Sequence, residues 1–589
     1  MHPTRTPRVL LLALALLTVA LVGCLGNETD DGDAPGTPGE RHAPDAAEMA
    51  GAGPFSLFLC QDGYRVGADA LAVVDRCNHR VTKPLVDPGQ RDPAGDRPDV
   101  RTQHGPANEV SIAVNPTDAL NLAGGAKDYT VSYVSDVAEC GEYTVWMGTF
   151  SSHDGGLTWT NDLMRGFPGD DRESPLTGNQ CNTDPVLVYD DDGTLWYSGL
   201  NYDGAREDTS TAASPLSGHD ALSGSQLYFA KSEDGGGSYP DISFAAAGDD
   251  GVIFNDKQWF AVQPGGDHMI ATWSQFVIAG PAGFATDVIA YTESLDGGAT
   301  WSPQKILRPG GDVGGQDPSS TGIPAAGQFS MPQYLPGASA TDPAMDLAVI
   351  WWDGEKVLYA EGQLTSGGAE FGPIQSTFPV NSLSSDPGRD GTGPTEYRLS
   401  TYPVLAVDPG TEACDGRRYV IWPDQEGEVN TDVEVLLRHS DDGLTWSEPI
   451  TVNDESQSDQ LMPWIDVDPE GGVHAVWYDK RHDADNRLMD VYYGYSADCG
   501  ETWTNLRVTE TSFDGDLAHH QNGSPFIGDY IGVDTTAESA HIIWADTRHS
   551  CPTDAGTCEA PMRIGSDVYA ATLLKDLDAR ATFDAAFQG

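Results

Sequence analysis

The stretch Ser152-His153-Asp154-Gly155-Gly156-Leu157-Thr158-Trp159 decides how this chain folds, because its pattern returns along the sequence. The string Ser-x-Asp-x-Gly-x-Thr-Trp appears again at residues 294–301 and 496–503. Two looser copies exist: residues 232–239 end in Ser and Tyr, and in residues 439–446 we align Asp441 with the aspartate and His439 with the serine. Five copies of so specific a string indicate a repeat protein.

Each copy of the string has the composition of a tight hairpin turn. Its glycine accepts a positive φ angle, its aspartate and hydroxyl side chains bond the backbone of the turn, and its Trp covers the sheet below. The string therefore predicts a turn between two antiparallel strands.

A second pattern marks the strands themselves. Apolar runs end in Trp-x-Asp at Trp351, Trp422, Trp477 and Trp544, and another apolar strand precedes each run. Counting these units gives seven sheets of about four strands, which begin near Glu109, Asn182, Asn255, Gln328, Tyr397, Gln460 and Gly523. We predict an all-β fold, a seven-bladed β-propeller of four-stranded antiparallel sheets, with six blades as the alternative.

The repeated strings resemble the Asp-boxes, or BNR repeats, of the sialidase superfamily, and this resemblance covers most of residues 109–574. It implies that the strings are structural turns between the outer strands of propeller blades, away from the active site. None of their aspartates is therefore expected to be catalytic. The seventh unit lacks the string, so we expect the segment around residues 55–74 to complete its last strand and close the ring.

The composition excludes some functions. The chain has 589 residues, of which 39% are hydrophobic, so it can bury a large core. Its 90 acidic residues exceed its 32 basic ones, and the net charge of −58 argues against nucleic acid as a partner, because binding phosphates needs Lys and Arg. Such an acidic surface suits concentrated salt, where screening removes the self-repulsion, so we hypothesise a salt-loving source.

The N-terminus predicts export. Arg5 and Arg8 precede an apolar run over residues 9–22 that is shorter than the roughly 20 residues a membrane span needs. Its end resembles the lipobox of exported lipoproteins, which implies that Cys24 is lipidated; the alternative is an ordinary signal with an incidental Cys. We divide the chain into a signal (1–24), a disordered acidic tether (25–54), an N-terminal extension (55–108), the propeller (109–574) and a tail (575–589).

The cysteines agree with an oxidising compartment. Eight remain after Cys24, and no pair has the spacing of a zinc ribbon, so four disulfides are the simplest expectation. Cys60 with Cys77 and Cys551 with Cys558 are candidate pairs, although the sequence does not fix the connectivity.

A site is expected where the innermost strands begin, because residues far apart in sequence converge there on one mouth of the channel. Carboxylates at that mouth suit acid–base chemistry and aromatic rings stack on sugar faces. Each carboxylate has a structural alternative as a turn cap, and Asp256 with Lys257 has one as a surface ion pair. The mouth positions are Glu109, Asp184, Asp256 with Lys257, Met331, Tyr402, Trp464, and Asp529 with Tyr530. The catalytic candidates are Asp184, Asp256, Asp529, Glu109 and Tyr402, and the substrate-binding candidates include Lys257, Trp464 and Tyr530.

Arginines form a separate group of candidates. The order Asp-x-Arg-His recurs at residues 479–482 and 546–549, and this internal likeness favours a structural role in which Asp holds Arg. The alternative is that Arg481 and Arg548, together with Arg398, grip an anionic sugar. The resemblance to sialidases would require three such arginines, a Tyr nucleophile paired with Glu, and an Asp proton donor. The Phe- or Tyr-Arg-Ile-Pro string of that family is missing; Tyr397-Arg398-Leu399 is a partial match.

The leading functional hypothesis is a cell-surface, sialidase-like exo-glycosidase acting on extracellular glycans. The alternatives are a non-catalytic propeller that binds glycan or protein at the channel mouth, and a rigid scaffold. We expect no cofactor and no metal, an extracellular carbohydrate or glycoprotein as partner, and contact with the membrane through the N-terminal lipid alone.

Overall fold

The computed structural model describes residue 49 and residues 52–67, 77–82, 105–134, 144–203, 223–247, 253–278, 284–307, 327–337, 346–380, 397, 402–425, 432–521, 524–550 and 565–584. The predicted signal, Cys24 and most of the tether lie outside these residues. His42–Gly589 contain all the described residues and form one compact unit.

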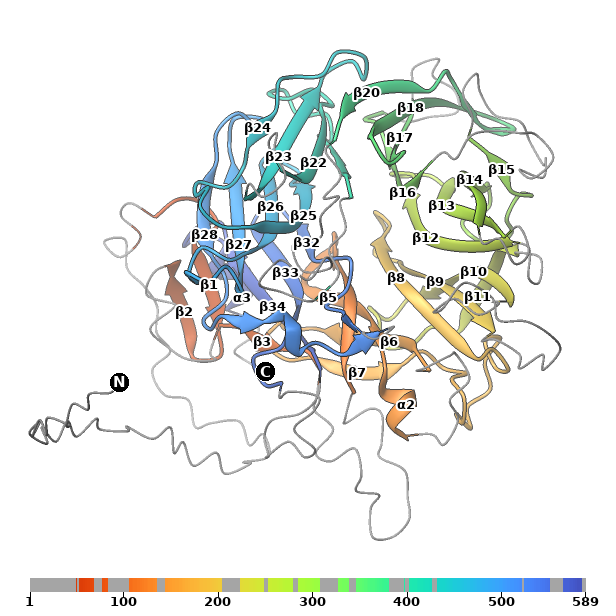
Figure 1. Ribbon diagram of the computed structural model, residues 1–589, viewed down its shortest axis with the longest axis horizontal. Helices are drawn as coiled ribbons and strands as arrows, with labels where there is room; N and C mark the ends of the chain where they lie inside the picture. The colour runs from red at the N-terminus through yellow and green to blue at the C-terminus, as the bar shows by residue number, and fades with distance from the viewer. Residues whose placement is uncertain are drawn as a thin grey trace, which may run out of the picture. The chain divides into compact units, whose positions relative to one another are not determined.

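The described strands form seven antiparallel sheets in chain order (Figure 1). The first three sheets have four strands each. They contain β4 (Ala107–Asn115), β5 (Asp118–Asp128), β6 (Trp146–Ser152) and β7 (Thr160–Leu163); β8 (Cys181–Tyr189), β9 (Leu195–Asp203), β10 (Ser223–Ser232) and β11 (Asp241–Ala247); and β12 (Ile253–Val262), β13 (Met269–Ile278), β14 (Phe284–Ser294) and β15 (Lys305–Ile306).

The next three sheets repeat the plan, two of them with an extra strand. They contain β16 (Gln328–Tyr334), β17 (Leu347–Trp352), β18 (Lys356–Thr365), β19 (Gly368–Phe371) and β20 (Gln375–Pro379); β21 (Val404–Val407), β22 (Arg418–Gln425), β23 (Val433–Ser440) and β24 (Ile450–Thr451); and β25 (Gln460–Val467), β26 (Val473–Asp479), β27 (Leu488–Ser496), β28 (Thr504–Arg507) and β29 (Phe513–Asp514).

The seventh sheet joins the two ends of the propeller sequence. It combines β32 (Gly532–Thr535), β33 (Ser539–Asp546) and β34 (Asp567–Leu574) with the N-terminal strands β1 (Leu57–Cys60), β2 (Gly63–Val66) and β3 (His79–Arg80). Short elements complete the described chain: α2 (Thr130–Val134), η3 (Gly515–Leu517), α3 (Arg580–Phe583) and the hairpin of β30 (His520–Gln521) and β31 (Ser524–Pro525).

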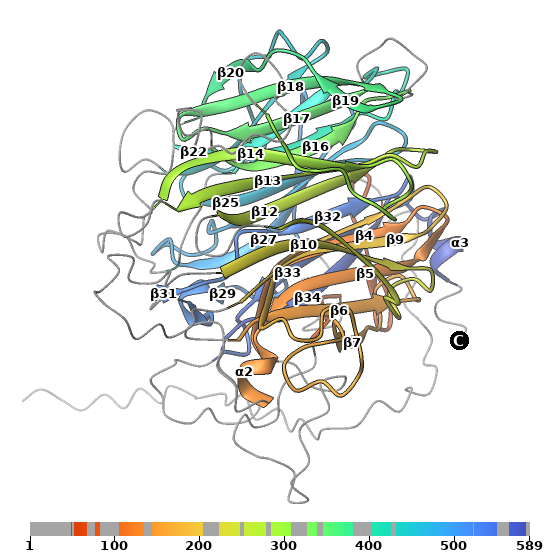
Figure 2. The ribbon, with the colours of Figure 1, turned by 90° about the vertical axis from the view of Figure 1, so that its right-hand side faces the viewer.

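The seven sheets close into a ring, so the predicted seven-bladed propeller is confirmed and the six-bladed alternative is wrong. Each innermost strand packs on the innermost strand of the next sheet, in the order β4, β8, β12, β16, β21, β25 and β32, and β32 packs on β4. Viewed from the side, the strands of a blade such as β12, β13 and β14 lie side by side across the ring (Figure 2).

The N-terminal segment supplies the outer strands of the seventh blade. Leu57 and Phe58 of β1 pair with Leu574 and Leu573 of β34, and β3 pairs with the other half of the same strand. A disulfide between Cys60 and Cys77 ties these two additions together, as the sequence suggested. A second disulfide, between Cys414 and Cys499, joins the fifth and sixth blades. Cys551 and Cys558 lie outside the described residues.

The Asp-box strings form the predicted turns between the third and fourth strands of their blades. In the sixth blade, Asp498 accepts hydrogen bonds from the Ser496 hydroxyl, the Thr502 amide and the Thr502 hydroxyl at 2.8, 2.8 and 2.7 Å. Gly500 has a φ angle of 84°, which other residues rarely adopt. The same bonds recur at Asp154, Asp234 and Asp296.

The fifth copy follows a different alignment from the one the sequence suggested. Ser440, not His439, donates to the carboxylate, and the carboxylate is that of Asp442, not Asp441. Asp442 also accepts from the Thr445 amide at 2.7 Å, so this turn is one residue shorter than the others. The serine of each string is the last residue of its strand, and its hydroxyl donates to the aspartate that closes the turn. This bond therefore identifies Ser440 and Asp442 as the serine and the aspartate of the fifth copy.

The blades pack through large aromatic side chains on their second strands. Trp273, Trp351, Trp422, Trp477 and Trp544 are fully buried between neighbouring sheets. In three of the four Trp-x-Asp pairs the indole N–H donates to the aspartate, at 2.8 Å for Trp422 and 2.9 Å for Trp477 and Trp544. Over the residues that the structure describes, no helix is long and apolar enough to cross a membrane.

Candidate functional site

The innermost strands share a backbone irregularity at the end where they begin. Their pairing with the second strand shifts register close to Glu109, Asp184, Lys257, Phe329 and Met462, and each of these five residues has a φ angle between 48° and 61°. This left-handed conformation costs about 1–2 kcal/mol for a residue with a Cβ atom. Because it recurs in five blades, the propeller itself imposes the bulge, and different side chains occupy one structural position around the channel.

Four of the predicted residues meet in a buried cluster at this end. The Lys257 ammonium lies 2.9 Å from the Glu109 carboxylate, 2.7 Å from that of Asp529 and 3.9 Å from that of Asp184. Lys127 on β5, which the sequence analysis did not single out, lies 3.2 Å from Glu109. Side chains from the first, second, third and seventh blades are thus joined by ion pairs in the centre of the ring.

Burial and charge shift the pKa values in this cluster. Burial raises the pKa of Glu109, and the neighbouring Lys127 and Lys257 offset this only in part. The pKa of Asp184 is also raised by burial. Burial opposes the charge of Lys257, but Asp184, Asp529 and Glu109 outweigh it and hold its pKa well above the usual range. The lysine therefore stays charged, and burial and the two lysines act in opposite directions on the pKa values of Glu109 and Asp184.

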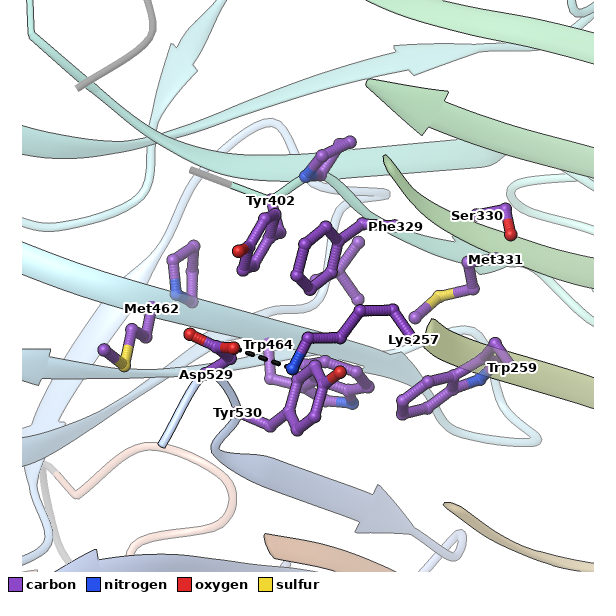
Figure 3. A pocket seen from close by; sticks show the side chains of 13 residues that line it. Lys257, Trp259, Phe329, Ser330, Met331, Tyr402, Met462, Trp464, Asp529 and Tyr530 are labelled. Atoms are coloured by element: carbon purple, nitrogen blue, oxygen red, sulfur yellow. Dashed lines mark ion pairs between the residues drawn. The ribbon is translucent and has the colours of Figure 1, made fainter. Parts of the chain in front are cut away.

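A small pocket opens next to this cluster (Figure 3). Aromatic rings and two methionines form its walls, and Lys257 reaches across it toward Asp529. The lining residues are Lys257, Trp259, Phe329, Ser330, Met331, Tyr402, Pro403, Val404, Met462, Pro463, Trp464, Asp529 and Tyr530.

The aromatic walls are in contact with one another. The ring centroids of Trp259 and Trp464 are 4.9 Å apart, and Tyr530 lies 6.1 and 6.2 Å from them. The Lys257 ammonium is 4.9 Å from the centre of the Tyr530 ring and 5.6 Å from that of Phe329. Such a pocket offers flat apolar faces beside one carboxylate and one ammonium.

The structure brings most of the predicted mouth residues together. Lys257, Tyr402, Trp464, Asp529 and Tyr530 line the pocket, as does Met331. Glu109 and Asp184 stand behind Lys257 and do not line it. Asp184 also accepts the backbone N–H of Lys257 at 3.2 Å, so it links the second and third blades. Asp256 does not line the pocket, although its charge acts on Asp184.

Arg481 and Arg548 do not reach the pocket. The guanidinium of Arg481 donates to both oxygens of Asp479 and stacks 3.9 Å from the centre of the Tyr492 ring, whose hydroxyl bonds His482. Arg548 repeats this arrangement with its own partners, which are Asp546, Tyr569 and His549. The repeated Asp-x-Arg-His order therefore forms a local structural unit, the first of the two interpretations. Arg398 lies outside the described residues.

Several site residues were missed from sequence. Phe329 and Met462 occupy the bulge position of their blades, Trp259 lines the pocket, and Lys127 pairs with Glu109 in the buried cluster. Aligning the inner strands on the residue at which pairing resumes after the bulge, which is Met331 or Trp464 here, would have found Phe329 and Met462 two places before it. Lys127 comes from a second strand, and the rarity of lysine in the chain is the one signal that could have pointed to it.

A wider cavity continues along the channel beyond the pocket. Trp259, Met331, Val404 and Trp464 line both spaces and so form a collar between them. Within the described part of the chain, no group of three or more His, Cys, Asp or Glu side chains is arranged to hold a metal ion.

No protein-family profile matches the chain, and no curated protein matches its sequence. Solved structures similar to it include a protein of unknown function from Dyadobacter fermentans, at 11% identity over 85% of this chain and 98% of that one, with a TM-score of 0.40. The α-L-arabinanase of Penicillium chrysogenum complexed with arabinobiose has 11% identity over 85% and 98%, with a TM-score of 0.38. The intramolecular trans-sialidase of Ruminococcus gnavus has 12% identity over 78% and 93%, with a TM-score of 0.34.

Proposed function

We propose that this protein binds a sugar unit without a negative charge, part of an extracellular glycan, in the pocket at the channel mouth. The observation that carries the proposal is the wall of aromatic faces around the Lys257–Asp529 pair. Pyranose and furanose rings present C–H faces that stack on Trp and Tyr, and their hydroxyl groups bond a carboxylate and an ammonium.

The charge of the pocket favours an uncharged sugar over sialic acid. Among the described lining residues the one cation is Lys257, and Glu109 and Asp529 already hold its ammonium at 2.9 and 2.7 Å. An anionic sugar would have to compete with two buried carboxylates for this ammonium. The bidentate arginine contacts that would favour sialic acid are absent from the described lining, since Arg481 and Arg548 are held elsewhere.

Hydrolysis of a glycosidic bond is the second candidate, and the carboxyl cluster favours it. Glycosidases commonly need one carboxyl group that keeps its proton near neutral pH and one that is ionised. Burial raises the pKa of Glu109 and Asp184, whereas Asp529 lines the pocket and is paired with Lys257. In this candidate Asp529, the one carboxyl group among the described lining residues, contacts the reacting sugar, and Tyr402 and Trp464 orient the ring.

We propose further that the chain is exported and held at the outer face of the cell membrane by a lipid on Cys24. The apolar run over residues 9–22 and the lipobox-like end support this. The Cys24→Ser variant should then leave the membrane fraction. Retention of this variant in that fraction would contradict the lipid anchor without bearing on the pocket.

The binding proposal is tested by following tryptophan fluorescence during titration in molar salt. Methyl glycosides of neutral sugars should bind saturably, and sialosides and uronides should bind at least tenfold more weakly. Trp464→Ala should abolish binding, whereas Trp503→Ala, in an Asp-box turn at the opposite end of the blade, should not. Tighter binding of sialosides, or equal loss in both variants, would contradict the proposal.

Fluorogenic glycosides decide whether the protein is also an enzyme. Turnover of neutral substrates that Asp529→Asn removes, with binding kept, would support the hydrolytic candidate. Saturable binding without any turnover would leave the protein as a binding propeller.

A further inference from the structure

The wide cavity beyond the collar is a channel that opens at the end of the propeller opposite the pocket. Its wall comes from the innermost strand of every blade, and its rim comes from the turns that follow these strands. Such turns lie beside the Asp-box turns; the Gly297 amide of one Asp-box, for example, donates to the Asp267 carbonyl of the neighbouring turn at 2.9 Å. The channel is therefore a concave surface on the other side of the collar from the sugar pocket. The exposed rim residues are Pro116, Asp191, Pro264, Pro336 and Pro409.

The channel wall keeps apolar surface that packing does not cover. Most of the lining residues are apolar. Five of these apolar side chains are only partly buried: Val188, Trp259, Val262, Val407 and Trp464. They come from the second, third, fifth and sixth blades. A concave, mostly apolar wall with a few polar groups is the usual form of a small-molecule site, so the channel can accept an apolar body.

The charged side chains of this lining are all acidic. Among the described residues that line the channel there are four aspartates and no Lys, Arg or His. Asp191 lies on the rim, and Asp408 accepts the backbone N–H groups of its own turn. Asp466 on β25 and Asp534 on β32 belong to the wall itself. The channel thus presents negative charge without a basic side chain, unlike the pocket, which Lys257 lines.

Asp466 and Asp534 are neighbours across the boundary between the sixth and seventh blades. Both contact Thr535: its hydroxyl donates to Asp466 at 2.6 Å, and its backbone N–H donates to Asp534 at 3.0 Å. Asp534 also accepts the backbone N–H of Val114, on the innermost strand of the first blade, at 2.7 Å. All of these donors are uncharged, so they hold the two carboxyl groups in position without neutralising them. A cation in the channel can therefore interact with both.

Indole rings lie on the same wall. Trp464 and Asp466 are two residues apart on β25, so their side chains point to the same side of the strand, roughly 7 Å apart along it. The centroid of the Trp259 ring lies 4.9 Å from that of Trp464, and both rings line the channel. Indole faces attract positively charged groups, most strongly where water is excluded. Indole faces, carboxylates and aliphatic side chains thus line one space.

We propose that the channel is a second binding site and that its ligand is a small organic cation with an apolar body. The charged nitrogen lies near Asp466 and Asp534, and the apolar body contacts the Trp and Val side chains of the wall. The lining aspartates would repel an organic anion, a neutral molecule would gain nothing from them, and a hydrated inorganic cation would gain nothing from the apolar wall. This inference goes beyond the proposed function and does not depend on it.

The test is isothermal titration calorimetry of the full chain in molar salt with three probes that share a hexyl chain: hexyltrimethylammonium, hexan-1-ol and heptanoate. At about pH 9 both wall aspartates are ionised, because burial raises the pKa of Asp466 only to about 7 and that of Asp534 only to about 6. The cation should bind saturably and about tenfold more tightly than the alcohol, and heptanoate should bind more weakly than both. Equal affinities for the cation and the alcohol would overturn the proposal.

Variants locate the bound cation. Asp466→Asn keeps the acceptor for Thr535 but removes the charge, so it should weaken cation binding about tenfold and leave hexan-1-ol binding unchanged. Glu233→Gln removes the same charge from an exposed site and should change neither. Val188→Trp puts a ring into the channel and should weaken the binding of both probes. Loss of cation binding in Asp529→Asn, with full binding kept in Asp466→Asn, would put the cation in the sugar pocket and overturn the proposal.

A crystal structure of the wild type decides the question if Asp466→Asn does not fold. Crystals soaked with (6-bromohexyl)trimethylammonium should show the anomalous signal of bromine inside the channel, between the collar and the rim. Absence of bromine from the channel, whether it is bound elsewhere or not at all, would contradict the second site.

Discussion

The two ends of each blade repeat in different ways. At the Asp-box end the side chains themselves recur: Asp154, Asp234, Asp296 and Asp498 each accept the same set of bonds from a serine and from a threonine or serine. At the pocket end the backbone recurs instead. The bulge with positive φ returns in five blades, but it carries Glu109, Asp184, Lys257, Phe329 and Met462.

This difference distinguishes the residues that maintain the fold from those that form the site. Side chains that repeat from blade to blade stabilise a turn that recurs in the fold. One backbone position that carries a different side chain in each blade builds an asymmetric pocket from symmetric parts. Substitutions at the two ends should therefore have different effects on stability and on binding.

The largest effect is expected at the centre of the pocket end. Lys257→Met leaves the buried carboxylates of Glu109 and Asp529 without their shared ammonium, so the free energy of unfolding should fall by about 3–5 kcal/mol. Lys231→Met, which breaks an exposed pair with Glu233, should change it by less than about 1 kcal/mol. Chemical denaturation measures both changes. Equal losses of stability in Lys257→Met and Lys231→Met would mean that the buried ion pairs of Lys257 contribute no more than an exposed pair.

The seventh blade has the N-terminal segment in place of the repeated turn. Removing the disulfide of this segment should therefore lower the stability of the protein more than removing any one Asp-box turn. Replacing Cys60 and Cys77 by Ser releases a loop with a sequence separation of 17. Closing such a loop is worth about 3 kcal/mol by chain entropy. Thermal unfolding of the double variant measures the loss, and an unchanged midpoint would show that β1 and β3 hold the ring without the covalent link.

A smaller loss is expected from crowding the segment that precedes the innermost strand of the seventh blade. A Cβ atom on Gly528 would lie 2.5 Å from the backbone nitrogen of Glu109, and the φ angle there is 101°. Gly528→Ala should therefore destabilise the protein by about 1–3 kcal/mol and weaken sugar binding. Gly337 also has a positive φ angle, 76°, but open space surrounds the position of its Cβ atom. Gly337→Ala should therefore lower the free energy of unfolding by only about 1 kcal/mol and leave sugar binding unchanged. Equal losses in the two variants would show that the contact with Glu109 is unimportant.

The smallest effect belongs to a single turn at the Asp-box end. Asp498→Ala removes the acceptor for Ser496 and Thr502 and should cost about 1 kcal/mol, with sugar binding unchanged. Burial opposes ionisation there, but the bonds from Thr502 and Ser496 outweigh it and lower the pKa of Asp498. Its stabilisation is therefore present above the ordinary pKa of an aspartate and is lost as the pH falls below it, so the wild type and the variant should converge in acid. Weaker sugar binding in Asp498→Ala would contradict the separation of the two ends.

The sequence predicted most of the fold, because its signals are local. A hairpin turn needs a serine, an aspartate and a glycine within a few residues, so Ser152, Asp154 and Gly156 show it directly. The fifth copy was misaligned because two adjacent aspartates, Asp441 and Asp442, fit the string almost equally well, and only the bond from Ser440 separates them.

The site was less predictable, because its members come from different blades. The rule that mouth residues precede each inner strand found Glu109, Lys257 and Asp529. It gave no sign of the bulge, which turns Lys257 toward the channel and leaves Asp256 outside the pocket. The roles of Arg481 and Arg548 depended on where Asp479 and Asp546 point, and that is a matter of packing rather than of sequence pattern.

The crystal structure of the protein soaked with its tightest-binding neutral methyl glycoside would show whether the aromatic pocket holds a sugar. We predict one sugar ring against Trp464 and Tyr530, with a hydroxyl group within hydrogen-bonding distance of Asp529. A sugar bound in the wide channel or at the Asp-box turns, with the aromatic pocket empty, would contradict it.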